Sequence, residues 1–301
     1  MEKVGLLGLG IMGSAMSSNL IKAGYQVIGY DPLEKQVARL ESLGGKSADN
    51  PREVAEQCPA IITSLPTVEV LQRVVQGDQG LIHASRQGLI VIECSTFPLS
   101  AKNEARIALE RSGTIMLDCP LSGTGAQAEK RDIVILASGD EAACKQCEPV
   151  FQAIGRATHY LGTFGAGSKM KFVANLLVAV HNVSAAEAFV MGMKGGLDPE
   201  TMYRVISDSA GSSRRLEVRG PMMVAGEYEP ATMKLGVFQK DIAMIRDFAR
   251  QLGSPTPLLD ASAGIYDQAN SMGWENWDTG AVCALLEHLA GWSRGGKSAA
   301  D

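Results

Sequence analysis

Residues 4–13 read VGLLGLGIMG, and this stretch decides the fold. The apolar run Val4–Leu7 predicts a short strand, and the glycine-rich turn after it leads into a helical pattern over Met12–Ala23. A strand, a G-x-G-x-x-G turn and a helix in this order are typical of the first unit of a dinucleotide-binding domain. The turn supplies the first six candidate binding residues: Gly8, Leu9, Gly10, Ile11, Met12 and Gly13.

The three glycines and the acidic residue Asp31 each have a physical role in this interpretation. The first glycine permits the tight turn, the second lets the backbone approach a pyrophosphate, and the third lets the helix pack closely. Asp31 ends the second predicted strand, Gln26–Tyr30, where a carboxylate bonds the ribose hydroxyls of NAD. A carboxylate repels the 2′-phosphate of NADP, and no arginine follows Asp31 directly. The pattern favours NAD over NADP, although Asp31 before Pro32 is also an ordinary turn residue.

The rest of the first half continues the alternation of strands and helices. Further strands are predicted at Ala60–Thr63, Leu89–Glu93, Thr114–Leu117, Ile133–Ala137 and Thr158–Leu161. The alternation predicts an α/β Rossmann domain, that is, a doubly wound, mostly parallel sheet with helices on both faces. We place this NAD-binding domain at residues 1–164.

The second half of the chain shows helix-like apolar stretches without the strand pattern of the first half. The Ala-, Val- and Leu-rich stretch Ser168–Met193 contains no proline and predicts one long interdomain helix. More helices are predicted at Pro199–Ser207, Lys240–Gln251 and Leu258–Asn270. We therefore expect an all-α domain at residues 165–290, and a small, polar tail at 291–301 that is disordered.

Composition narrows the partners and the compartment. The chain has 301 residues, 46% of them hydrophobic, and a formal net charge of -5. A mildly acidic globular protein predicts no nucleic-acid and no membrane partner, and we expect no apolar run long enough to cross a bilayer. Six scattered cysteines fit a reducing, cytoplasmic location. The four histidines show no metal-ligand spacing, so we expect no metal.

Two further motifs carry candidate chemistry. DCPLSGTG at residues 118–125 ends a strand, where Ser122 and the N–H groups of Gly123 and Thr124 could hold a carboxylate; a Pro-Gly turn without function is the alternative. GAGSKMKFVAN at residues 165–175 begins the long helix, and Lys171 and Asn175 share one face because they are four apart. The alternative for Lys171 is a surface lysine at a helix start.

Together these motifs give the chain a family resemblance. GLGIMG, Leu65-Pro66, Ser95-Thr96, DCPLSG, GAGSKMK with Asn175, and Lys240-Asp241 occur in the same order as in the β-hydroxyacid dehydrogenases, whose members include 3-hydroxyisobutyrate, 2-(hydroxymethyl)glutarate and L-threonate dehydrogenases. The chain resembles this family from about Val4 to Leu289. The resemblance implies a Rossmann domain, a helical domain and NAD-dependent oxidation of a small β-hydroxy acid.

The resemblance also implies roles for individual residues. Lys171 is similar to the family's catalytic lysine, which acts as a general base in the neutral form that burial favours. Asn175 would bind the substrate beside it, and Ser122, Gly123 and Thr124 would bind the substrate carboxylate. Four more residues would line the cofactor site: Leu65, Pro66, Thr96 and Lys240. Family members imply a homodimer or homotetramer.

The chain departs from the family pattern near the substrate. Thr124 replaces the usual second glycine of the loop, and the segment from Gln127 to Arg131 replaces a Gly-Ala-x-x-Gly pattern. Arg214 and Arg215 lie where relatives place residues facing the substrate, and could contact a second acidic group or several hydroxyls. Adjacent residues do not share a helix face, so at most one points inward, and a solvated pair is the alternative. A sugar acid such as L-threonate, or a 3-hydroxyisobutyrate-like acid, is the leading substrate hypothesis.

Two other functions stay open from the sequence. An NADPH-dependent reductase of a small semialdehyde, of the succinic semialdehyde or glyoxylate type, would favour an arginine near Asp31. A cofactor-binding scaffold without catalysis would lack Lys171 and carry basic extensions, and an imine reductase would also lack the lysine. The presence of Lys171 favours the dehydrogenase.

Overall fold

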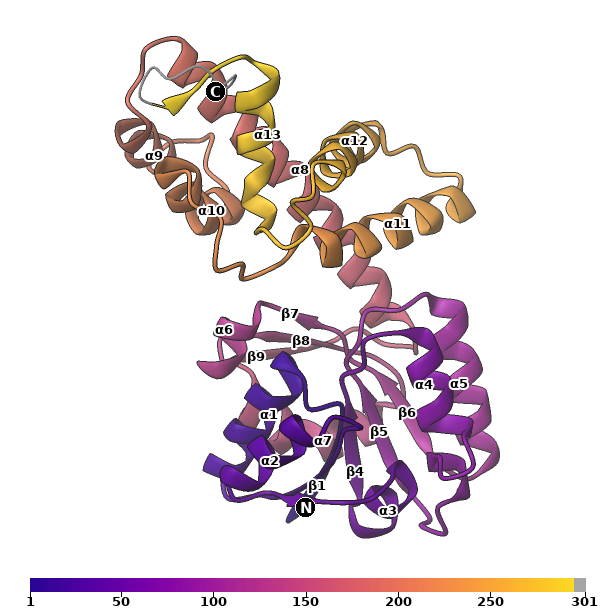
Figure 1. Cartoon of the computed structure of the whole chain (residues 1–301). Helices are drawn as coiled ribbons and strands as arrows, with labels where there is room; N and C mark the ends of the chain where they lie inside the picture. The colour runs from indigo at the N-terminus through magenta and orange to yellow at the C-terminus, as the bar shows by residue number, and fades with distance from the viewer. Residues whose placement is uncertain (295–301) are drawn as a thin grey trace. The chain divides into compact units, whose positions relative to one another are not determined.

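The chain folds as two compact units. The computed structural model describes residues 1–294, so most of the tail that was expected to be disordered lies outside the described residues. One unit ends at Lys171 and the other begins at Phe172 (Figure 1). The division falls within the long helix α8 (Ala166–Lys194), which therefore contributes to both units.

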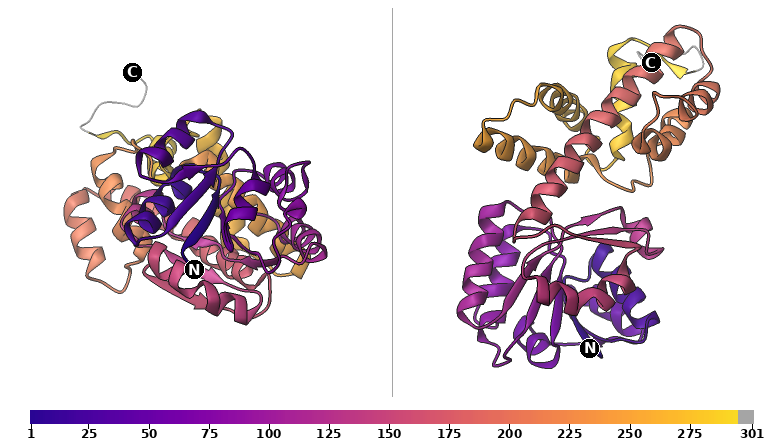
Figure 2. Two further views of the ribbon diagram at one scale, coloured as in Figure 1. Left: turned by 90° about the horizontal axis from the view of Figure 1, so that it is seen from below. Right: turned by 180° about the vertical axis from the view of Figure 1, so that it is seen from behind.

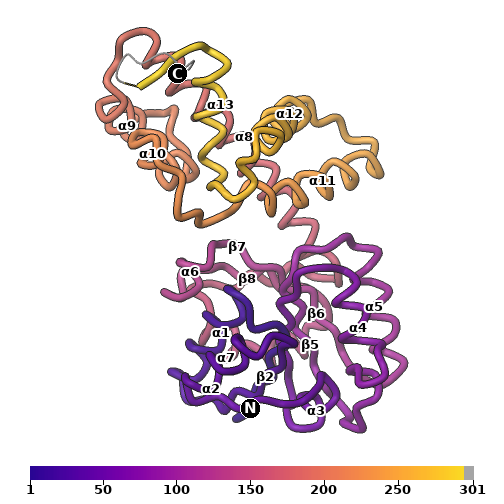
Figure 3. Tube along the Cα trace, in the orientation of Figure 1, coloured from indigo at the N-terminus to yellow at the C-terminus, as the bar shows by residue number. Residues whose placement is uncertain are grey.

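A six-stranded parallel sheet is the centre of the first unit. Its strand order is β3 (Lys46–Ser47), β2 (Gln26–Tyr30), β1 (Lys3–Leu7), β4 (Ala60–Thr63), β5 (Ile90–Glu93) and β6 (Ile115–Asp118). The chain runs outward from β1 to β3 and then returns to place β4 beside β1 (Figure 3). The order reverses between β1 and β4, and this switch point is where open α/β sheets form a ligand crevice at the carboxyl ends of the strands.

Helices cover both faces of this sheet (Figure 2). On one face lie α1 (Ile11–Lys22), α2 (Glu34–Ser42) and α7 (Glu141–Ile154); on the other lie α3 (Pro51–Gln57), α4 (Val68–Gln76), the short helix Leu81–His83 and α5 (Leu99–Arg111). Successive strand residues point to opposite faces: Ile90 and Ile92 join the core under α1 and α7, whereas Val91 joins the core under α4 and α5. Both faces are buried, as predicted for a doubly wound sheet.

A second, three-stranded sheet follows β6. Its order is β7 (Leu121–Ser122), β8 (Val134–Ala137) and β9 (Ala157–Tyr160), with the short helix α6 (Gly125–Glu129) between β7 and β8. β7 pairs antiparallel with β8, and β8 pairs parallel with β9. The sequence predicted β8 and β9 as strands but not the separate sheet, because a two-residue strand such as β7 leaves no periodic pattern.

The second unit is all-α, as predicted. After α8 come α9 (Pro199–Ser207), α10 (Arg214–Ala225), α11 (Leu235–Leu252), α12 (Pro257–Ser271), the short helix Thr279–Ala281 and α13 (Val282–Leu289). The sequence analysis did not predict α10 or α13. Gly220 and Pro221 lie inside α10 and are helix breakers by composition, yet the Ser213 side chain caps this helix.

The length of helix α8 contradicts the expectation that no apolar run is long enough to cross a bilayer. Its 29 residues are long and apolar enough to cross a membrane by length and composition, so the expectation of no such run is wrong. Ala179, Ala186 and Phe189 on this helix are fully buried in the protein. Packing within the described chain covers only part of the apolar surface of α8, because Val173, Leu177 and Met191 on the same helix are exposed.

Candidate active site

The three glycines of the turn after β1 have three different environments. Gly8 adopts a φ of +88°, and a Cβ on it would lie 2.2 Å from the Ser64 carbonyl oxygen. A Cβ on Gly13 would lie 1.9 Å from the Gly8 carbonyl oxygen, whereas a Cβ on Gly10 would meet nothing within 4 Å. Gly8 and Gly13 therefore make the turn and its packing possible, and the open space lies at Gly10.

The open space at Gly10 suits an anionic group. Gly10 precedes α1 without a side-chain cap, and no acidic residue occupies the first turn of this helix. The first N–H groups of a helix have no partner within the helix, and its N-terminal end carries a partial positive charge. The turn thus has the chemistry and the room for the pyrophosphate of a dinucleotide.

Asp31 lies at the carboxyl end of β2, beside the glycine turn. Its Oδ2 accepts a hydrogen bond from the Leu9 N–H at 2.8 Å, and its Oδ1 accepts one from the Leu33 N–H at 2.9 Å. These two bonds fix the carboxylate at the edge of a cavity of about 760 Å³, a volume within the usual range for ligand sites. Seven of the predicted cofactor residues line this cavity: Gly8, Gly10, Ile11, Met12, Asp31, Leu65 and Pro66.

Four predicted cofactor residues do not line the cavity. Leu9 and Gly13 are buried behind the turn. Thr96 is half-buried on the loop after β5, and Lys240 is exposed on α11 in the helical unit. Sequence reasoning missed Arg73 of α4, which does line the cavity. Arg73 is far from Asp31 along the chain, so a search for an arginine directly after Asp31 could not find it.

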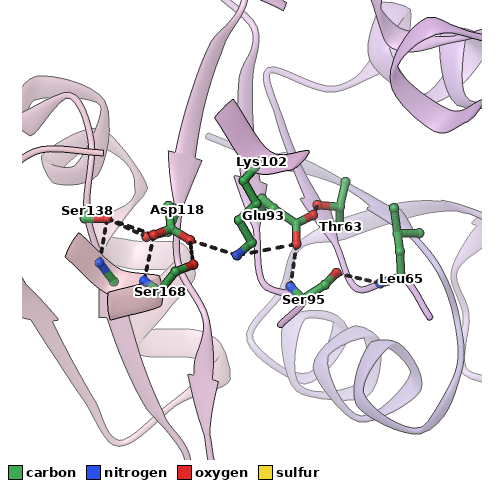
Figure 4. Close-up of polar contacts among 9 residues, drawn as sticks. Thr63, Leu65, Glu93, Ser95, Lys102, Asp118, Ser138 and Ser168 are labelled. Atoms are coloured by element: carbon green, nitrogen blue, oxygen red, sulfur yellow. Dashed lines mark hydrogen bonds and ion pairs between the residues drawn. The ribbon is translucent and has the colours of Figure 1, made fainter. Parts of the chain in front are cut away.

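A fully buried lysine connects the carboxyl ends of β5 and β6 (Figure 4). Lys102 of α5 is 0% exposed, and its Nζ lies 2.8 Å from Asp118 Oδ1 and 3.8 Å from Glu93 Oε1. Burial raises the pKa of Glu93, partly opposed by the Lys102 charge. Burial lowers the pKa of Lys102, but Asp118 and Glu93 outweigh it and the net direction is upward, so Lys102 is a cation.

The same network holds the loops around the site (Figure 4). Glu93 accepts hydrogen bonds from the Ser95 N–H and the Thr63 hydroxyl, and Ser95 Oγ accepts one from the Leu65 N–H at 2.8 Å. Asp118 accepts from the N–H of Ser168 at 2.8 Å and from its hydroxyl at 2.7 Å. One buried ion network thereby ties the loops after β4 and β5 to the first turn of α8.

The loop predicted to bind a carboxylate lies against the cofactor turn. Ser122 pairs with Val134 of β8, and Gly123 has a φ of +146°, which favours glycine. A Cβ on Gly125 would lie 2.3 Å from Ile11 Cγ2, so the loop packs directly on the start of α1. The structure thus brings the two predicted loops together.

Thr124 has a partner that the sequence analysis did not foresee. Its N–H donates to Gln127 Oε1 at 3.0 Å, and its side chain accepts from the Gln127 N–H, which forms a reciprocal capping box at the start of α6. The Thr124 N–H is therefore occupied in this conformation, while Ser122 and Gly123 remain half-exposed. Arg131 has a φ of +60°, a left-handed conformation that favours glycine.

Lys171 and Asn175 lie one turn apart on α8. Lys171 is 7% exposed and Asn175 4%, whereas Lys169 is exposed. Asn175 Nδ2 donates to Asp241 Oδ2 on α11 at 3.0 Å. Asp241 belongs to the Lys240-Asp241 motif but was not predicted as a site residue. Its position next to Lys240 is the sequence feature that could have identified it.

Fold and site together define an NAD(P)-binding oxidoreductase. A family model described as the NAD binding domain of 6-phosphogluconate dehydrogenase matches residues 3–162. A second, described as NAD-binding of NADP-dependent 3-hydroxyisobutyrate dehydrogenase, matches residues 165–286.

Individual relatives match over nearly their whole length. The chain is 31% identical to 2-(hydroxymethyl)glutarate dehydrogenase of Eubacterium barkeri over 98% of both chains. It is 33% identical to L-threonate dehydrogenase of Cupriavidus necator over 95% of this chain and 96% of that one. A 3-hydroxyisobutyrate dehydrogenase structure from Salmonella typhimurium superposes with a TM-score of 0.84 at 29% identity, covering 95% of this chain and 100% of that one. The chain belongs to the 3-hydroxyisobutyrate dehydrogenase-like β-hydroxyacid dehydrogenases, which confirms the family, fold class and enzyme class predicted from the sequence.

Proposed function

We propose that the protein is an NAD-dependent dehydrogenase that oxidises a small β-hydroxy acid, such as a sugar acid of the L-threonate type or a 3-hydroxyisobutyrate-like acid. The observation that carries this proposal is the pair of buried polar residues on one face of α8, Lys171 and Asn175. The two residues are four apart, so their side chains project from the same side of the helix. Asn175 is held by Asp241, which fixes its orientation.

Each residue of the site has a defined task in this reaction. Ser122 and the Gly123 N–H hold the substrate carboxylate. Lys171 Nζ removes the proton of the hydroxyl group during oxidation and returns it in the reverse direction. Asn175 orients the hydroxyl through its amide. When bound, the cofactor supplies the nicotinamide ring that accepts the hydride.

Most of the residues that hold the cofactor in this proposal belong to the first unit. The turn at Gly10 takes the pyrophosphate, and Asp31 takes the ribose hydroxyls, which is the basis of the NAD preference. Leu65, Pro66, Thr96 and Lys240 belong to the cofactor site by family resemblance. We further propose a cytoplasmic homodimer or homotetramer.

One observation supports a preference for NADP over NAD. Arg73 lines the same cavity as Asp31, and a guanidinium is the usual partner of a 2′-phosphate. This supports the second candidate, an NADPH-dependent reductase of a small semialdehyde. The ratio of kcat/KM with NAD to that with NADP separates the two, and a ratio well below one favours the reductase.

The decisive experiment compares two lysines of α8. Wild type, Lys171→Ala and Lys169→Ala are assayed by cofactor absorbance against L-threonate, D-threonate, L-serine, 3-hydroxyisobutyrate and 2-(hydroxymethyl)glutarate. Lys171→Ala should lower kcat by roughly 10²–10⁴-fold, the usual contribution of a general base, and leave NAD binding intact. Lys169→Ala is the matched control, because Lys169 is exposed. Near-normal turnover by Lys171→Ala would exclude it as the base.

A further inference from the structure

Helix α1 carries a buried asparagine well away from the glycine turn at its start. Asn19 lies in the third turn of this helix and is 4% exposed. Asparagine is a poor residue for a helix interior, because its amide competes for backbone hydrogen bonds, and a buried amide is costly unless it is bonded. Local helix geometry therefore gives no reason for Asn19, and its partner lies outside α1.

That partner is the short helix α6, which follows the loop proposed to bind the substrate carboxylate (Figure 1). Asn19 Nδ2 donates to the Ala128 carbonyl oxygen at 2.7 Å, across 109 positions of sequence. The same oxygen accepts from the Arg131 N–H at 3.0 Å, so both of its lone pairs are used. Ala128 is fully buried and belongs to the same apolar core as Ala15 and Met16 of α1. A hydrogen bond and apolar packing thus join α6 to α1.

A second contact joins the two helices at their N-terminal ends. Ile11 begins α1, lines the cofactor cavity and is 75% exposed. A Cβ on Gly125, the first residue of α6, would lie 2.3 Å from Ile11 Cγ2. The side chain that a bound dinucleotide covers therefore also lies against the start of α6.

Helix α6 depends on these contacts because it is too short to hold its own conformation. It has five residues, and isolated helices of this length are unstable in water. The capping box of Thr124 and Gln127 fixes its start, and the Asn19 hydrogen bond fixes its last turn. The loop before α6 is fixed at its other end, where Ser122 pairs with Val134 of β8. The position of this loop relative to the cofactor turn is thus set through α1.

We propose that Asn19 is a positioning residue that couples the cofactor helix α1 to the substrate loop, so that a dinucleotide bound at the turn of Gly10 orders the Ser122–Gly123 loop for the substrate carboxylate. This inference rests on the proposed function and adds a regulation of the same site, in which the cofactor prepares the acid site. A ligand that rigidifies one element lowers the ordering cost for the second ligand, which gives positive coupling without a change of fold. By linkage, binding of the acid strengthens dinucleotide binding by the same factor.

The test uses ADP, which ends at the pyrophosphate and lacks the nicotinamide ring and its ribose. ADP occupies the turn at Gly10 without supplying any group that reacts with the substrate. Hydrogen exchange of the backbone amides is followed by mass spectrometry on the full chain, with and without saturating ADP. In wild type, ADP should slow the exchange of residues 124–129 at least about threefold, because these amides exchange through local opening of α6.

Two variants remove the connection, and one control keeps it. Asn19→Ala should abolish the slowing, while its dissociation constant for ADP, measured by calorimetry, rises by no more than about threefold because the coupling is reciprocal. Asn19→Asp should act in the same way, since it keeps the side-chain shape and replaces the N–H donor by an oxygen. Ser17→Ala is the matched control, because Ser17 is fully buried on α1 and its hydroxyl donates to the Gly13 carbonyl oxygen of the same helix at 2.8 Å. This control should keep the slowing.

The exchange data can overturn the proposal in two ways. If ADP leaves the exchange of residues 124–129 unchanged in wild type, the cofactor turn does not act on α6; this result needs no variant. If the slowing persists in both Asn19 variants, or is lost equally in Ser17→Ala, Asn19 does not transmit it.

Turnover separates a failure of this inference from a failure of the proposed function. Asn19→Ala should raise KM for the oxidised acid by about three- to tenfold, the effect of one lost hydrogen bond, with smaller changes in kcat and in KM for NAD. Ser17→Ala should leave KM for the acid unchanged, and an equal rise of both KM values in Asn19→Ala would mark a general loss of packing and overturn the positioning role. If wild type oxidises no hydroxy acid but the ADP effect depends on Asn19, the proposed function fails and the coupling stands. If wild type oxidises an acid and the ADP effect is absent, the coupling alone fails.

Discussion

Replacing the buried lysine of the first unit is the sharpest test of how the site is held. Methionine in the Lys102→Met variant keeps a similar volume, so the change is mainly electrostatic. Asp118 loses the Nζ at 2.8 Å and Glu93 loses the same charge at 3.8 Å. Both carboxylates are 0% exposed, so water cannot replace the lost cation. Breaking a buried ion pair by removing one partner costs roughly 3–5 kcal/mol of unfolding free energy.

The pH dependence of the Lys102→Met effect has a definite sign. Burial raises the pKa of Glu93 above its ordinary value of 4.5, so the folded protein binds this proton more readily than the unfolded chain. The contribution of Glu93 to stability is then present below that value and is lost as the pH rises through the raised pKa. Removing the Lys102 charge raises the pKa of Glu93 further. The stability deficit of the variant should therefore be largest at neutral pH and shrink under acidic conditions.

The assay uses the distribution of tryptophans. All three, Trp274, Trp277 and Trp292, belong to the helical unit. Denaturant unfolding of Lys102→Met should shift the far-UV circular dichroism transition, which reports both units, more than the tryptophan fluorescence transition. Lys145→Met is the control: Lys145 forms an exposed pair with Glu141, and losing it should change stability by less than about 1 kcal/mol. If Lys102→Met unfolds like Lys145→Met at every pH, the buried network does not stabilise the first unit.

Two further predictions concern backbone positions. Gly10→Ala should keep the fold, since its Cβ meets nothing within 4 Å, yet weaken NAD binding by at least about tenfold in calorimetry. Gly13→Ala should also lower the melting temperature, because its Cβ would lie 1.9 Å from the Gly8 carbonyl oxygen. Equal NAD binding and equal melting temperatures of the two variants would contradict the assigned roles. Arg131→Gly should be about 1 kcal/mol more stable than Arg131→Ala. Both variants lose the 2.7 Å hydrogen bond to the Gln152 carbonyl oxygen, but only glycine relieves the positive φ. Chemical denaturation measures the difference in unfolding free energy, and equal stability of the two variants would show that the backbone at Arg131 is not strained.

Local rules explain why much of the first unit was predictable. The roles of Gly8 and Asp31 depend on a strand, a turn and the next strand, all within a short stretch of chain. Lys171 and Asn175 share a face through helix geometry alone. The cavity residues from the glycine turn and Asp31 follow from these rules, whereas others, such as Asn50, Val70 and Arg73, come from later segments of the chain.

Errors and omissions occurred where partners are far apart in sequence. β8 and β9 were predicted as strands, but their separate sheet depends on the two-residue strand β7. Helix α10 was missed because Pro221 suggests a break, although packing retains the helix through it. The sequence analysis also underestimated the apolar length of α8, which is long and apolar enough to cross a membrane by length and composition.

The sequence by itself determined the fold class, the family and the order of the binding motifs, because these depend on periodicity and on short-range backbone geometry. Only the tertiary structure decided which charges are satisfied. Lys102 forms an ion pair with Asp118, Asn175 donates a hydrogen bond to Asp241, and Asp278 is occupied by Arg219 and the surrounding loops. These partners are far apart in sequence, so no local sequence pattern encodes the pairings. Arg215 Nε and Nη2 have no hydrogen-bond partner among residues 1–294, since folding has already committed the nearby Asp278 to Arg219 and the surrounding loops.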